Sequence, residues 1–295
     1  MAEQAVADIL KKVQRIQIVA NRAVDDLFAG QYKSVFRGRG MEFDEVREYQ
    51  PGDDVRSIDW NVTARAGTPY IKRFCEEREL TVMFMVDVSA SGAFGSGKRS
   101  KLDVVIEVAA LLMFSAMKNN DKVGLVTFCD DVIEYLPPRK GKANTLHIVR
   151  QLVAAEPVAR QTNLESALEF VGRVQKRRAV VFLISDFIAP EARHAMAVCG
   201  RRHDLIAVNI TDPREEVLPD VGFINLVDAE TGEIVELDTR HPQVRALFER
   251  QAVNRAESLS QQLKRSEVDE LPIGTADDYV GDLRRFFNMR EKRFR

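Results

Sequence analysis

Short β-branched runs alternate with longer helical patterns from residue 80 onward, and this alternation constrains the fold more than any other feature. The segment Ala179–Ser185 is apolar almost throughout, which is typical of a strand buried on both faces of a sheet. Similar runs occur at Leu80–Val86, Lys122–Phe128 and Asp204–Ile210, separated by helical stretches. The pattern predicts an α/β fold with a doubly wound, mostly parallel sheet and helices on both faces.

Three segments are expected along the chain. Residues 1–79 begin with an amphipathic helix pattern and continue into a stretch rich in Arg, Gly and Asp, which predicts a small β-rich subdomain with Trp60 as its core residue. Residues 80–240 carry the alternating pattern. Residues 241–295 are expected to form helices that pack on or extend from that domain, the last of them beginning near Ala276.

Two C-terminal features depart from the alternation. Residues 223–237 predict a β-hairpin that turns through Gly232 with a positive φ. The end of the chain is basic and aromatic. We expect a helix there that packs Phe286, Phe287 and Met289 while its arginines stay solvated.

Composition argues against several function classes. The net charge is −2, so no global field favours nucleic acid or a membrane surface. The longest apolar stretch, Val104–Met117, is too short and too polar to span a bilayer. The cysteines, Cys75, Cys129 and Cys199, lack CxxC spacing, as expected for reduced thiols in a cytoplasmic protein.

A glycine-bearing loop between a predicted strand and helix admits two interpretations. Gly92–Lys98 matches the phosphate-binding pattern GxxxxGK, but the next position, which should be Ser or Thr to ligate magnesium, is Arg99. The polar run Asp87-Val-Ser-Ala-Ser91 also separates the strand from the glycines, and the phosphate interpretation gives it no role. These two points weigh against a phosphate site, but the GxxxxGK match keeps a P-loop-like nucleotide-binding ATPase as an alternative.

A metal site would use that polar run. Asp87, Ser89 and Ser91 alternate just past the strand, so in an extended segment their side chains share one side. Thr162 precedes a helix and Asp186 follows a strand, and parallel strands bring such loops to the same edge of the sheet. All five residues offer hard oxygen donors, which suit Mg²⁺ or Mn²⁺ with waters filling the gaps.

Asp87-x-Ser-x-Ser91, followed by Thr162 and Asp186, resembles the metal-ion-dependent adhesion site of von Willebrand factor type A domains. The resemblance implies a von Willebrand factor A-like fold, including a short antiparallel strand at Val132–Leu136. It also implies that the two carboxylates act partly through waters. The cation would keep a vacancy for the carboxylate of a protein partner.

An upstream block resembles a second signature. The signature of the bacterial domain-of-unknown-function family fifty-eight is similar to two runs of this chain. They are Arg37-Gly-Arg-Gly-Met-Glu-Phe-Asp-Glu-Val-Arg-Glu-Tyr-Gln-Pro-Gly-Asp-Asp-Val-Arg-Ser-Ile-Asp-Trp-Asn-Val-Thr-Ala-Arg65 and Pro69-Tyr-Ile-Lys-Arg-Phe74. Members carry this block just before a von Willebrand factor A-like domain and are commonly linked to MoxR-type AAA+ ATPases. The resemblance implies an adaptor that works with such an ATPase, on a client protein, in complex assembly or maturation.

Catalytic patterns are absent from the sequence. The four histidines, His147, His194, His203 and His241, show no HExxH spacing, and no GxSxG elbow occurs. A haloacid-dehalogenase-type phosphatase would have a second Asp at position 89, where this chain has Ser. We therefore expect a metal-dependent interaction protein and no enzyme, with a divalent-metal-dependent hydrolase as a further alternative.

Overall fold

The structure of the chain is a computed structural model, and it forms two compact units. The described residues are 9–20, 42–75, 79–158, 161–227 and 232–294. One unit comprises residues 36–80, and the other comprises the remainder of the chain. Residues before position 36 belong to the same unit as the main domain and not to the small unit, whereas one N-terminal segment over residues 1–79 was expected. The segment 241–295, expected to pack on or extend from the main domain, belongs to the same unit as that domain.

The small unit contains an antiparallel two-stranded ribbon and short helical turns. Its elements are β1 (Glu42–Glu48), η1 (Val55–Ser57), α3 (Trp60–Ala66) and β2 (Tyr70–Cys75). Asp59 caps α3 by accepting the amides of Asn61 and Val62. The expectation that Trp60 forms the core of this unit is wrong, because α3 buries none of its residues and Trp60 is 68% exposed.

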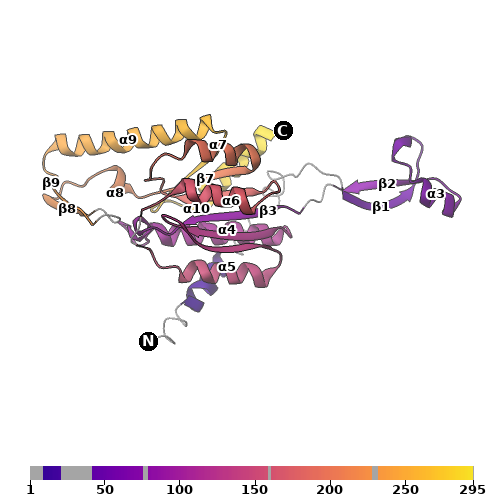
Figure 1. The fold of residues 1–295 in the computed structure, drawn as a ribbon, viewed down its shortest axis with the longest axis horizontal. Helices are drawn as coiled ribbons and strands as arrows, with labels where there is room; N and C mark the ends of the chain where they lie inside the picture. The colour runs from indigo at the N-terminus through magenta and orange to yellow at the C-terminus, as the bar shows by residue number, and fades with distance from the viewer. Residues whose placement is uncertain (1–8, 21–41, 76–78, 159–160, 228–231, 295) are drawn as a thin grey trace. The chain divides into compact units, whose positions relative to one another are not determined.

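The large unit is built on a six-stranded sheet (Figure 1). Its strands are β3 (Thr81–Asp87), β4 (Lys122–Phe128), β5 (Val132–Arg139), β6 (Val180–Ser185), β7 (Asp204–Thr211) and β10 (Asp269–Gly274). The spatial order is β10-β7-β6-β3-β4-β5, and every neighbouring pair is parallel except β4 and β5. The predicted α/β class and the antiparallel strand after β4 are confirmed.

Helices cover both faces of the sheet. They are η2 (Ala90–Ala93), α4 (Lys101–Lys118), α5 (Lys142–Ala154), α6 (Leu164–Val174), α7 (Arg193–Arg202), α8 (Pro213–Glu216), α9 (Pro242–Arg265) and α10 (Tyr279–Phe294). In Figure 1, α4 and α5 lie on one face, and α6, α7 and α9 lie on the other. Among the described residues, none of the helices combines the length and the apolar character needed to cross a membrane.

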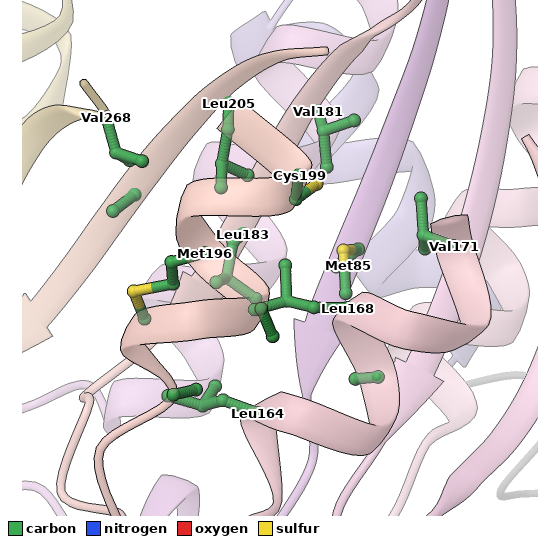
Figure 2. Packing of buried hydrophobic residues seen from close by; sticks show 14 of the residues in the cluster. Met85, Leu164, Leu168, Val171, Val181, Leu183, Met196, Cys199, Leu205 and Val268 are labelled. Atoms are coloured by element: carbon green, nitrogen blue, oxygen red, sulfur yellow. The ribbon is translucent and has the colours of Figure 1, made fainter. Parts of the chain in front are cut away.

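The core forms where helices close over the sheet. Met85 and Leu183 project from adjacent strands toward α6 and α7, where they meet Leu168 and Met196 (Figure 2). On the opposite face, Phe84 stacks on Phe182 of the neighbouring strand, with ring centroids 5.3 Å apart. Strands β3, β4, β6 and β7 are therefore buried on both faces, as their apolar sequences predict.

The N-terminal residues join the large unit through a helix over residues 9–20. Val13 and Ile16 are buried, and the ammonium of Lys12 lies 2.6 Å from a carboxylate oxygen of Asp103 in α4. The amphipathic pattern in the sequence also includes Val24 and Leu27, which lie outside the described residues.

The C-terminal segment departs most from expectation. It contributes the edge strand β10, parallel to β7, where only helices were expected. The last helix begins at Tyr279 and not near Ala276, because the Thr275 hydroxyl donates to Asp212 at 2.7 Å instead of capping a helix there. Within α10, Phe286 and Phe287 are buried as expected, whereas Met289 is 53% exposed. The expectation that the arginines of this helix stay solvated is wrong for Arg290, which is buried.

The predicted hairpin is present. It comprises β8 (Phe223–Val227) and β9 (Ile234–Asp238), which pair antiparallel. Gly232 has a φ of 74°, which is the left-handed conformation that the turn was expected to need.

Candidate metal centre

The five predicted ligands lie at the carboxyl edge of the main sheet, and hydrogen bonds link Asp87, Ser89, Ser91 and Thr162. The chain leaves β3 through α4 toward β4 on one side, and later enters β6 on the other side of β3. This reversal is the place where open α/β sheets form a crevice. Asp87 ends β3 and Asp186 follows β6, so both lie at this edge.

The loop that carries Thr162 is tied to the same edge by its backbone. The amide of Val158 donates to the carbonyl of Val88 at 2.9 Å, and the amide of Asn163 donates to the carbonyl of Cys129 at 2.7 Å. These bonds place the buried Thr162 beside β3, although the two residues are far apart in sequence.

Asp87 is the centre of the polar cluster. Its Oδ1 accepts the amide of Ser89 at 2.9 Å, and its Oδ2 accepts the hydroxyls of Thr162 at 3.1 Å and Ser185 at 2.7 Å. Burial raises the pKa of Asp87 above its ordinary value, and the nearby charge of Asp186 adds to the effect, while the Ser89 and Ser185 hydrogen bonds oppose it. A bound cation would relieve this cost of burying negative charge.

Ser89 and Ser91 also face one another. Their hydroxyl oxygens lie 3.0 Å apart, with Ser89 buried and Ser91 half-buried. The segment is less extended than predicted, because Ser91 lies in the 3₁₀ turn η2 that follows Ser89. The two hydroxyls meet across this turn and not along a straight strand.

Asp186 also lies at this edge, but its carboxylate is paired with the ammonium of Lys101. Its Oδ1 accepts the amide of Ile188 at 3.1 Å, and its Oδ2 lies 2.6 Å from the ammonium of Lys101. Lys101 also lies 2.6 Å from Glu215 Oε1. Burial lowers the pKa of Lys101, but the two carboxylates outweigh this effect and raise it above its ordinary value.

Three residues of this cluster were not predicted from the sequence. Ser185 holds Asp87, while Lys101 and Glu215 form the ion pairs around Asp186. Lys101 did leave a signal: it is a cation at the first position of a helix, where the dipole disfavours positive charge, directly before a buried apolar run. Glu215 lies in a four-residue helix after β7, and only the fold brings it here.

The donor set fits a hard divalent ion. Cis oxygens around an octahedral Mg²⁺ lie about 3.0 Å apart for bonds of about 2.1 Å. The Ser89–Ser91 and Thr162–Asp87 oxygen separations of 3.0 Å and 3.1 Å are close to this value. No group of three or more His, Cys, Asp or Glu side chains suited to a metal occurs in the described part of the chain. Coordination here would therefore combine hydroxyls, carboxylates and water.

The glycine loop beside this cluster is folded back on itself. The amide of Lys101 donates to the carbonyl of Phe94 at 2.8 Å, and the amide of Ser96 donates to Asp212 at 3.0 Å. At the start of α4, Ser100 and Asp103 form a capping box, so a carboxylate already bonds to the helix N-terminus. This arrangement places negative charge where a phosphate would bind in a P-loop.

The sheet order, the two helical layers and the polar edge define a von Willebrand factor A-like domain. Among solved structures, the large unit's fold is similar to that of an aerotolerance-related membrane protein from Bacteroides fragilis, at 16% identity and a TM-score of 0.50 over 72% of this chain and 99% of that one. The SpRpn10 VWA domain is also similar, at 12% identity and a TM-score of 0.38 over 70% of this chain and 94% of that one.

Sequence comparison then gives the family. The profile described as "Protein of unknown function DUF58" matches residues 45–258, and the chain belongs to this family. An uncharacterized protein of Mycobacterium bovis is 30% identical over 284 residues, which span 95% of this chain and 89% of that protein. An uncharacterized protein of Bacillus subtilis, YeaD, is 26% identical over 172 residues, 57% of this chain and 40% of that protein.

Proposed function

We propose that this protein is an interaction adaptor whose von Willebrand factor A-like domain binds Mg²⁺ or Mn²⁺ and, through it, a carboxylate of a protein partner. The observation that supports the proposal most is the convergence of five oxygen-bearing side chains at one edge of the sheet. Asp87, Ser89, Ser91, Thr162 and Asp186 would hold the ion, directly or through water. The ion would supply a positive charge with one coordination position left for the partner.

The chain's own residues prepare this site. Ser185 and Thr162 orient the Asp87 carboxylate through hydrogen bonds of 2.7 Å and 3.1 Å. The Ser89 amide fixes its other oxygen. Because the carboxylate is held before an ion arrives, little ordering remains to be done on binding.

The family resemblance supports a proposal for the partner. We propose that a MoxR-type AAA+ ATPase binds this protein in the cytoplasm, and that the pair acts on a client in the assembly or maturation of protein complexes. An acidic side chain of the ATPase or of the client would complete the metal coordination.

The first test is metal binding by the purified protein. We expect Mn²⁺ to bind with about one-to-one stoichiometry in isothermal titration calorimetry, and Ser89→Ala or Asp87→Asn to weaken binding at least about tenfold, which corresponds to the loss of about 1.4 kcal/mol. Lys98→Ala is the matched control in the adjacent glycine loop and should leave Mn²⁺ binding unchanged. Equal binding by all four proteins would rule out this site.

The second test concerns the partner. A MoxR-type ATPase from the same organism should be retained by the immobilised protein in Mg²⁺ and released by EDTA. Asp87→Asn should reduce retention even in Mg²⁺. Retention that is indifferent both to EDTA and to this substitution would show that the two proteins interact elsewhere. ATP binding that is lost in Lys98→Ala would instead support the P-loop alternative.

A further inference from the structure

Lys101 is a buried cation in an unfavourable position. It is the first residue of α4, where the helix dipole repels positive charge, and it is only 2% exposed. Two carboxylates at 2.6 Å, Asp186 and Glu215, compensate for this burial. The centroid of the Phe94 ring lies 5.9 Å from the ammonium.

The two carboxylates are held independently of each other. Asp186 is fixed by the amide of Ile188 at the end of β6. Glu215 is fixed by a capping box in α8, where its Oε2 accepts the amide of Asp212 at 3.2 Å. Lys101 therefore has one partner that belongs to the candidate metal centre and a second that lies outside it.

The ammonium and a metal ion would compete for the same carboxylate. Lys101 engages Asp186 Oδ2, while the amide of Ile188 engages Oδ1. A divalent ion that draws on Asp186 must weaken the Lys101 contact, and it must also bind against the repulsion of a nearby positive charge in a poorly solvated site.

We propose that Lys101 is a built-in competitor that lowers the affinity of this centre for divalent metal. It neutralises Asp186 in the absence of metal, and Glu215 retains it when metal binds. The inference rests on the proposed metal site. Its consequence is that the metal and a partner carboxylate bind cooperatively, because the partner's negative charge offsets the repulsion from Lys101.

The test compares Mn²⁺ affinity among variants by calorimetry. Lys101→Met should tighten Mn²⁺ binding at least about tenfold, because it removes both the competition and the repulsion. Glu215→Gln should weaken binding, because the neutral amide oxygen holds the Lys101 ammonium less strongly than the carboxylate does, and Lys101 then stays on Asp186. Lys98→Met, which removes an exposed lysine three residues away, should leave the affinity unchanged.

The double variant Lys101→Met/Glu215→Gln provides a second measurement in case Lys101→Met alone does not fold. It removes one positive and one negative charge together, so no additional uncompensated charge is buried, and it should also bind Mn²⁺ more tightly than the original protein. Circular dichroism in EDTA checks that each variant is folded.

The outcomes separate this inference from the proposed function. If the original protein binds Mn²⁺ and the folded double variant binds it no more tightly, Lys101 is not a competitor, but the metal site stands. If neither protein binds Mn²⁺, both the metal site and this inference fail. Binding that is detectable only in the Lys101 variants would support the inference most strongly.

Discussion

At the scale of single residues, Gly95 shows why the glycine loop resembles a phosphate-binding loop. A Cβ at this position would lie 2.5 Å from the carbonyl oxygen of Arg99 and 2.7 Å from the Cα of Ser100. The glycine is therefore needed because two parts of the same loop approach closely. That approach lets Phe94 accept the amide of Lys101 at the start of α4.

We expect Gly95→Ala to destabilise the protein by about 1–3 kcal/mol, because the backbone of the loop must move to admit the methyl group. Gly97→Ala is the matched control: nothing lies within 4 Å of a Cβ there, and its effect should stay within about 0.5 kcal/mol. Urea unfolding followed by circular dichroism measures both. Equal effects would show that the fold-back of the loop does not depend on Gly95.

The candidate ligands could be proposed from the sequence, whereas the contacts of their neighbours could not. Asp87, Ser89 and Ser91 follow a strand, so a local pattern reveals them, and Asp186 occupies the matching position after another strand. The role of Lys101 depends on Glu215, which is 114 residues away in sequence. No local sequence pattern predicts this contact, because it arises only when β7 is placed beside β6.

At the scale of elements, His203 joins α7, β6 and β7 at the amino edge of the sheet. Its backbone amide ends α7 by donating to Cys199, and its Nδ1 accepts the amide of Ala179 at 3.3 Å. Burial, with the charges of Arg202 and Arg178, lowers its pKa from 6.5 to about 4. The imidazole is therefore neutral in the folded protein at neutral pH and serves as a hydrogen-bond acceptor.

This depressed pKa predicts a loss of stability in acid. Between about pH 6.5 and 4 the unfolded chain binds a proton at His203 that the folded chain does not, so the free energy of unfolding falls as pH falls, by roughly 2 kcal/mol at pH 5. His203→Asn supplies an uncharged acceptor to Ala179 and should remove this part of the pH dependence. Urea unfolding at pH 7 and pH 5 checks it; identical pH dependence in both proteins would contradict the assignment.

Strand β10 shows where element prediction failed. Its sequence, Asp-Glu-Leu-Pro-Ile-Gly, contains Pro272, which cannot donate to a β ladder and argues against a strand. The structure tolerates it because β10 is at the edge of the sheet and pairs with β7 alone. Leu271 and Ile273 flank the proline and are buried, but two apolar residues are too few to reveal a strand in the sequence.

At the scale of the whole molecule, the C-terminal segment completes the large unit. It supplies buried side chains from β10 and α10, namely Leu271, Ile273, Leu283, Phe286 and Phe287. Arg290, 2% exposed, lies 2.7 Å from Asp204 in β7 and 3.0 Å from Asp269 in β10, so α10 is linked to both strands. The large unit thus needs residues beyond position 240 to bury its sheet.

We therefore expect a protein ending at residue 240 to be insoluble or to lack a cooperative unfolding transition. Each lost apolar side chain contributes about 1.5–3 kcal/mol, so the five together amount to on the order of 10 kcal/mol, comparable with the whole stability of a typical domain. The edge of β7 would also be exposed and free to pair with other chains.

A protein ending at residue 290 is the matched control, because it keeps β10, the buried part of α10 and the Arg290 ion pairs. It should remain soluble and unfold in one thermal transition of this unit. It loses the exposed pair between Arg293 and Asp269, which is worth about 1 kcal/mol or less. Soluble yield and thermal unfolding by circular dichroism compare the two truncations. Cooperative unfolding of the protein that ends at residue 240 would show instead that residues 80–240 fold without β10, and that the sheet needs only the five strands that precede it.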